Sequence, residues 1–144
     1  MKFTEGYWLQ SERAHSLFAA QAWAVEKIPG GMRVLAATKP IHSRGDTLNL
    51  PTITLEYRAV SQNTISVTSW HYEGYDDSLP EPEKQEGIWD AEVSVTENEI
   101  LLDTGVLKVR VCRSPFSYRF EAGGKLLTES GFRNLGYIRW DKQP

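Results

Sequence analysis

The chain has 144 residues, of which 40% are hydrophobic and 24% charged, and its formal net charge at pH 7 is −3. This composition is typical of one globular domain, or part of one, that is large enough to bury a core without disulfides or metals. The weak negative charge and the scattered basic residues argue against nucleic acid as a partner. Because Cys112 is the only cysteine, an intrachain disulfide and a multi-cysteine zinc site are excluded.

The N-terminal stretch lacks the apolar centre of a signal peptide, and no hydrophobic run reaches transmembrane length. These features predict a cytoplasmic protein that does not contact a membrane. The first predicted element is a short aromatic strand or sheet edge at Tyr7-Trp8-Leu9.

Residues 14–28 contain five alanines, which favour a helix by intrinsic propensity. The alternation of Trp23 and Val25 with smaller or charged neighbours argues against it, as does the turn sequence that follows, Pro29-Gly30-Gly31. We therefore predict a hairpin with strands over 17–28 and 32–37. A polar connection over 38–49 follows.

Two further strands are predicted over 51–60 and 64–72. In the first strand Ile53, Leu55 and Tyr57 share one face, and in the second Ile65 and Val67 are expected to face the core.

Residues 73–87 hold two prolines and several carboxylates, so a solvated loop is expected there. The alternation of Ala91, Val93 and Val95 then predicts a strand over 88–96.

Residues 101–130 read as an antiparallel meander with turns at 103–105, 113–115 and 123–124. Leu107, Val109 and Val111 are expected on the core face, and Lys108 and Arg110 on the opposite face. A last strand is predicted over 136–140. Strands at intervals of about 8–12 residues favour an all-β fold, an antiparallel β-sandwich, over βαβ units.

The three histidines share no metal-ligand spacing, so neither a metal site nor another cofactor is predicted. Glycoside hydrolysis needs two carboxylates held about 5–9 Å apart. The acidic residues of the 73–87 loop are poor candidates for such fixed geometry. The aromatic residues that lead into this loop either pack on the sheet or form a platform for a sugar ring. With the adjacent histidine they are the candidate carbohydrate contacts: Trp70, His71, Tyr72 and Tyr75.

Several segments, in the same order along the chain, resemble the α-xylosidase-type members of glycoside hydrolase family 31. The matching segments are Met1-Lys2-Phe3-Thr4-Glu5-Gly6-Tyr7-Trp8-Leu9, Trp23-Ala24-Val25-Glu26, Gly45-Asp46-Thr47-Leu48-Asn49-Leu50-Pro51, the segment 67–74 that ends in His71-Tyr72-Glu73-Gly74, Thr104-Gly105-Val106-Leu107-Lys108-Val109-Arg110-Val111, Pro115-Phe116, and Gly124-Lys125-Leu126-Leu127.

The resemblance implies the N-terminal β-sandwich of the family, of the galactose-mutarotase-like type, which precedes a catalytic (β/α)₈ barrel with the acid/base and nucleophile aspartates. Residues 1–144 would be this single domain or its N-terminal portion, with the barrel absent from the chain. No residue here matches the family's nucleophile motif, so no catalytic residue is assigned. We expect the chain alone to be inactive and its parent to be a retaining α-glycosidase.

The expected role is that of a non-catalytic domain that supports the barrel and carbohydrate binding, with the 73–87 loop at the rim of the sugar pocket. The alternatives are a free-standing carbohydrate-binding module and a β-rich protein-interaction domain. The expected partners are the remainder of the parent glycosidase and its oligosaccharide substrate. A second copy of the chain is also expected, because an incomplete sandwich leaves an apolar face and an open edge.

Overall fold

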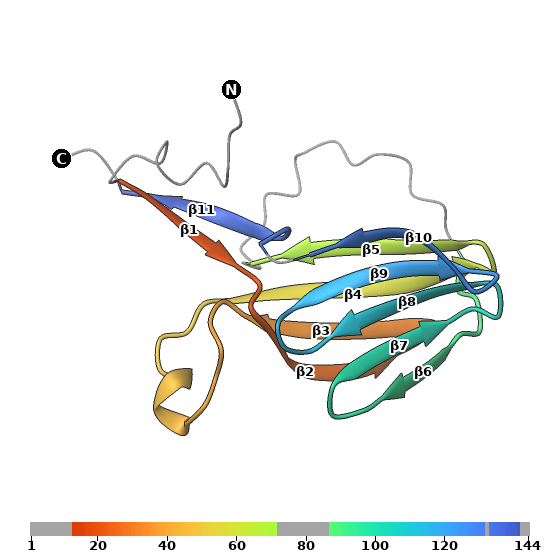
Figure 1. Ribbon diagram of the computed structural model, residues 1–144, viewed down its shortest axis with the longest axis horizontal. Helices are drawn as coiled ribbons and strands as arrows, with labels where there is room; N and C mark the ends of the chain where they lie inside the picture. Colours follow the sequence, from red (N-terminus) through yellow and green to blue (C-terminus); the bar gives the residue numbers. More distant parts are fainter. Residues whose placement is uncertain (1–12, 72–86, 132, 142–144) are drawn as a thin grey trace.

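The computed structural model describes residues 13–71, 87–131 and 133–141, which form antiparallel β-strands and one short 3₁₀ turn (Figure 1). The strands are β1 (Ala14–Phe18), β2 (Gln21–Ile28), β3 (Gly31–Ala37), β4 (Thr52–Ser61), β5 (Thr64–Trp70), β6 (Glu92–Val95), β7 (Glu99–Asp103), β8 (Leu107–Cys112), β9 (Ser117–Ala122), β10 (Lys125–Ser130) and β11 (Gly136–Trp140), and the turn is η2 (Arg44–Thr47).

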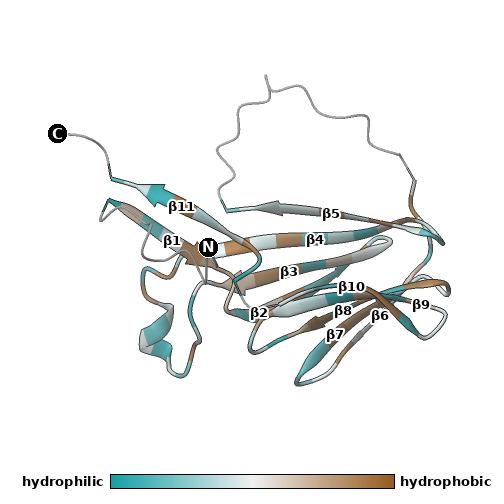
Figure 2. Ribbon diagram, turned by 45° about the horizontal axis from the view of Figure 1, so that its top comes forward, coloured by the Kyte–Doolittle hydropathy of each residue, from teal (hydrophilic) through white to brown (hydrophobic). Residues whose placement is uncertain are grey.

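The strands form two stacked sheets and a separate ribbon. One sheet has the order β2-β3-β4-β5, the other has the order β10-β9-β8-β7-β6, and β1 pairs with β11. Figures 1 and 2 both show the two larger sheets as layers, with the β1–β11 ribbon projecting from one end. The prediction of an all-β antiparallel sandwich is therefore confirmed.

The strict alternation in β4, one of the two central strands of its sheet, explains which of its faces is buried. Ile53, Leu55 and Tyr57 are all at least 97% buried and face the second sheet, whereas Glu56 and Arg58 lie on the outer face. A period of two places one set of side chains against a partner layer and leaves the other set in solvent. Figure 2 shows the resulting brown hydrophobic bands along the strands.

The core is built from the inner faces of both sheets. Val109 and Val111 are fully buried as predicted, Leu107 is half-buried, and Lys108 and Arg110 lie on the opposite face. The core consists of Ala19, Ala22, Met32, Val34, Ala36, Ile53, Leu55, Tyr57, Val93, Ile100, Leu102, Val109, Val111 and Phe116.

The segment 14–28 is not helical, as predicted, but the single strand expected over 17–28 is wrong. The chain forms β1 and β2 here, which belong to different sheets. At the break, the Ala19 N–H donates to the Leu135 carbonyl at 2.9 Å, and the Ala20 N–H donates to Ala37 at 2.8 Å. The backbone thus exchanges one set of hydrogen-bond partners for another within two residues.

The placement of Val67 in the core is also wrong, because its side chain is 42% exposed. Val67 belongs to β5, the last strand of its sheet, and the opposing layer does not cover that position fully. Ile65, on the same strand, does pack against the core. Val95 is likewise exposed at the end of β6, which spans 92–95 rather than the predicted 88–96.

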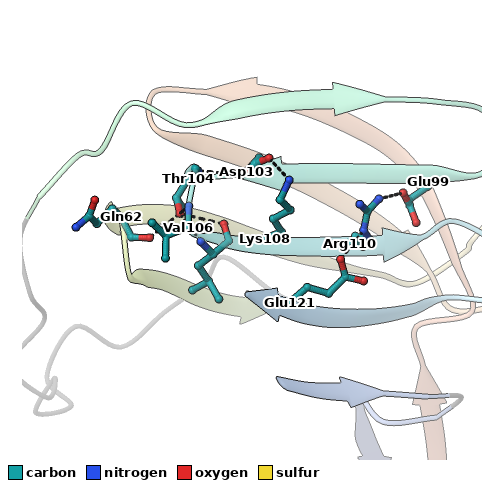
Figure 3. A network of polar contacts seen from close by, with 10 residues as sticks. Gln62, Glu99, Asp103, Thr104, Val106, Lys108, Arg110 and Glu121 are labelled. Atoms are coloured by element: carbon teal, nitrogen blue, oxygen red, sulfur yellow. Dashed lines mark hydrogen bonds and ion pairs between the residues drawn. The ribbon is translucent and has the colours of Figure 1, made fainter. Parts of the chain in front are cut away.

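A buried hydroxyl ties the two sheets together at the turn between β7 and β8 (Figure 3). The Thr104 hydroxyl donates to the carbonyl oxygen of Gln62 at 2.6 Å and accepts the N–H of Leu107 at 2.9 Å. The indole N–H of Trp89 donates to the Thr104 carbonyl at 3.2 Å. Since Gln62 lies in the turn between β4 and β5, these bonds fix one turn of each sheet against the other.

The outer face of the five-stranded sheet carries cross-strand ion pairs (Figure 3). The Arg110 guanidinium lies 2.6 Å from Glu99 and 2.9 Å from Glu121, and Lys108 lies 2.6 Å from Asp103. The hydrogen bond from Arg110 lowers the pKa of Glu121, and the one from Lys108 lowers the pKa of Asp103. Partly exposed pairs of this kind contribute little to stability and mainly keep the face polar.

Replacement of Val109 by alanine is expected to lower the free energy of unfolding by about 1–2 kcal/mol, because two fully buried methyl groups are removed. Urea denaturation of the two proteins measures this difference. A change within about 0.5 kcal/mol would place this face of β8 in solvent.

Candidate carbohydrate-contact site

Trp70 and His71, two of the four candidate carbohydrate contacts, lie at the end of β5. Trp70 is half-buried and pairs across the strands with Thr54 of β4. His71 follows directly and is exposed. Tyr72 and Tyr75 lie outside the described residues, as does most of the 73–87 loop.

His71 is packed against the ribbon rather than standing alone. Its ring stacks on the ring of Tyr137 in β11, with centroids 3.9 Å apart and planes 13° apart. Tyr137 was not among the predicted contacts, because nothing local in the sequence connects two residues this far apart. This stack joins the end of β5 to β11, so His71 contributes to the packing of the ribbon as well as to the surface.

The outer face of the four-stranded sheet offers a shallow depression of about 290 Å³. Thr54, the cross-strand partner of Trp70, is one of its lining residues. The lining residues are Ala24, Val25, Glu26, Arg33, Leu35 and Thr54. In general, an indole ring can stack on a sugar ring, and nearby polar groups accept and donate hydrogen bonds to its hydroxyl groups.

The polar groups of this face are held in a fixed arrangement. Glu56 accepts a hydrogen bond from Arg33 at 3.0 Å and also pairs with Arg58, while Arg33 lies 3.4 Å from Glu26. Burial of Glu56 would raise its pKa, but the hydrogen bonds from Arg58 and Arg33 outweigh that effect and hold the pKa below its ordinary value. Glu56 is therefore ionised at neutral pH.

The clear pKa shifts of carboxyl groups in the described residues all run in one direction. A general acid in a glycosidase needs a carboxyl group whose pKa is raised, so that it carries a proton at the working pH. Where a carboxyl group of the described residues departs clearly from its ordinary pKa, the shift is downward: Asp46, Glu56, Asp103 and Glu121.

Within residues 13–71, 87–131 and 133–141, no group of three or more His, Cys, Asp or Glu side chains is arranged to hold a metal ion. In the same ranges, no helix is long and apolar enough to cross a membrane.

The class that the fold defines is an antiparallel β-sandwich, with fixed ion pairs on the outer face of its four-stranded sheet. No family model matches the sequence. Among curated proteins, the chain is similar to the alpha-xylosidase XylQ of Lactiplantibacillus pentosus, with 33% identity over 133 residues. The match covers 90% of this chain and 17% of XylQ, so the chain spans about one sixth of the length of that relative.

This similarity confirms the resemblance to the α-xylosidase-type members of glycoside hydrolase family 31. It extends over nearly the whole chain, so the sandwich as a unit corresponds to one segment of a longer glycosidase.

Proposed function

We propose that this chain is the non-catalytic N-terminal β-sandwich domain, or the first part of it, of a family 31 α-glycosidase. The observation that carries the proposal is the 33% identity over 90% of the chain to a segment of an alpha-xylosidase. The sandwich is of the galactose-mutarotase-like type, and it supports a (β/α)₈ barrel that lies outside this chain. The parent is a cytoplasmic retaining α-glycosidase that removes xylose or a related sugar from an oligosaccharide.

The exposed face of the ribbon supports a role in contacting another domain. Ile138 and Trp140 of β11 are 61% and 58% exposed. They alternate with Tyr137, which stacks on His71, so one face of the ribbon packs on the sandwich and the other is open. Large apolar side chains gathered on an open face are typical of interaction surfaces.

The direct contact with carbohydrate that we propose for this domain is carried by Trp70 and His71, with Tyr72 and Tyr75 beyond the described residues. Loops and strand ends of an attached domain can reach the substrate only at the rim of a barrel site, because the catalytic residues lie at the C-terminal ends of the barrel strands. The position of Trp70 and His71 at the end of β5 fits that requirement.

Removing the corresponding segment from XylQ tests the supporting role. We expect the shortened enzyme to lose its α-xylosidase activity and its solubility, because the barrel would expose the surface that the sandwich covers. A chimera that carries this chain in place of the native segment is the matched control and should restore folding. A shortened enzyme as active as the intact one would contradict the supporting role.

The chain alone should release no product from aryl α-xylosides or α-glucosides above the buffer rate. Turnover that disappears when one acidic residue is replaced would contradict this expectation.

Titration with xylose-containing oligosaccharides distinguishes the two alternative functions, a free-standing carbohydrate-binding module and a β-rich protein-interaction domain. Saturable binding by the isolated chain, lost in Trp70→Ala, would support the binding module.

The isolated chain is also expected to associate with a second copy. Leu126 and Leu127 of the edge strand β10 are 54% and 59% exposed, and Val67 is exposed on the edge strand β5. Open edges and apolar side chains together favour association, through an interface expected to bury at least about 1,000 Å². Sedimentation velocity at micromolar concentration should give a dimer or larger species, and a clean monomer would contradict the expectation.

A further inference from the structure

A second cavity lies where the β1–β11 ribbon meets the end of the sandwich, and neither Trp70 nor His71 lines it. Its volume is about 510 Å³, within the range of small-molecule sites in proteins, about 300–1,000 Å³. Four separate segments line it: β1 with the link from β1 to β2, the start of the connection from β3 to η2, the turn between β8 and β9, and the connection from β10 to β11. Its lining residues are Ser16, Phe18, Ala20, Thr38, Lys39, Pro40, Ser114, Pro115 and Arg133.

The lining of this cleft is cationic in a chain whose formal net charge is −3. Lys39 and Arg133 contribute two positive charges, and none of the nine lining residues is acidic. Asp46 is close enough to Lys39 for the two charges to interact, but its carboxylate accepts the backbone N–H groups of His42 at 3.1 Å and Ser43 at 2.8 Å. These bonds hold Asp46 against its own loop rather than in the cleft.

The uncharged groups of the cleft divide into two kinds. Phe18, Pro40 and Pro115 provide apolar surface, and the Arg133 guanidinium lies 5.9 Å from the centre of the Phe18 ring. This cation–π contact favours a position of the guanidinium over the ring. Hydroxyl groups from Ser16 and Ser114 add polar surface to the same lining.

We propose that this cleft binds a small organic phosphate such as a sugar phosphate. A guanidinium and an ammonium are the groups that proteins use most often for phosphate, because one donates in a planar fork and the other acts as a compact charge. Inorganic phosphate would occupy only part of a cavity of this volume, so the apolar surface of Phe18, Pro40 and Pro115 accommodates the organic part. A neutral sugar can accept hydrogen bonds from the two cations but gains no charge–charge attraction from them.

The proposal is independent of carbohydrate contact at Trp70 and is tested on the full chain by calorimetric or NMR titration. Glucose 6-phosphate and glucose form a matched pair of probes that differ only in the phosphate. We expect saturable binding of glucose 6-phosphate that weakens as NaCl is added, because the contact is between exposed charges. Glucose should bind at least tenfold more weakly.

Substitution of Lys39 and Arg133 tests whether these two cations bind the phosphate. Lys39→Gln and Arg133→Gln should each weaken binding several-fold, and the double variant should weaken it more than tenfold. Lys125→Gln, at the exposed start of β10, removes a positive charge elsewhere and should bind as the unchanged chain does. Both cleft residues are exposed, so thermal unfolding should show that the variants keep the fold.

Three results would overturn the proposal. The first is no saturation by glucose 6-phosphate below about 10 mM, which corresponds to a binding free energy weaker than about 3 kcal/mol. The second is equal affinity for glucose and glucose 6-phosphate. The third is unchanged affinity for glucose 6-phosphate in the double variant.

Discussion

Replacement of Gly31 by alanine is expected to destabilise the sandwich by about 3 kcal/mol or more, because the new methyl group would collide with backbone. A Cβ at position 31 would lie 2.0 Å from the carbonyl oxygen of Tyr57 and 3.0 Å from the Cα of Arg58. Gly31 begins β3 and pairs with Arg58 of β4, so relief of the collision requires the two central strands to move apart. Chemical denaturation of the purified variant measures the loss.

Gly45→Ala is the matched control for this substitution. The nearest atom to a Cβ at position 45 is the Ser43 hydroxyl oxygen at 3.6 Å, an ordinary contact distance. Both variants remove one glycine from the unfolded chain, so the difference between them isolates the steric term. If Gly31→Ala unfolds at the same denaturant concentration as Gly45→Ala, the close approach of β3 and β4 is wrong.

Phe116→Ala is expected to cost about 3–5 kcal/mol, the range for truncation of a buried aromatic side chain. Phe116 is 1% exposed and packs edge-to-face against Tyr118, with ring centroids 6.2 Å apart. Its backbone N–H donates to the carbonyl oxygen of Ala20 at 2.9 Å, so the residue also joins the β8–β9 turn to the link between β1 and β2. A cavity here would loosen both.

Val106→Ala provides the comparison, since Val106, in the turn between β7 and β8, is 44% exposed. Its effect should stay within about 0.5 kcal/mol. Thermal and urea unfolding of the two variants should therefore differ widely. Equal midpoints would show that Phe116 is not part of the core.

The alternation of apolar and polar residues predicted the strands that have one face in the core and the other on the outside of the sheet. Alternation identified the inner face of β4 through Ile53, Leu55 and Tyr57, and that of β8 through Val109 and Val111, because each of these faces is fully covered. The same rule failed for Val67. Whether an edge position is covered depends on the width of the opposing sheet, which no local pattern contains.

The pairing of strands that are far apart in the sequence could not be predicted from local patterns either. Strand β1 pairs with β11, so that Ala14 lies opposite Trp140, and this contact divides the predicted strand 17–28 into two. The sequence named Trp70 and His71 as candidate contacts, but it could not predict the stacking of His71 on Tyr137, since their proximity follows from the tertiary fold alone.

The nucleotide sequence that follows the codon for Pro144 tests most directly the proposal that this chain is part of a larger glycosidase. The proposal predicts an open reading frame that continues without interruption through further strands into a (β/α)₈ barrel with the acid/base and nucleophile aspartates. A stop codon directly after Pro144, or a continuation into an unrelated domain, would contradict it.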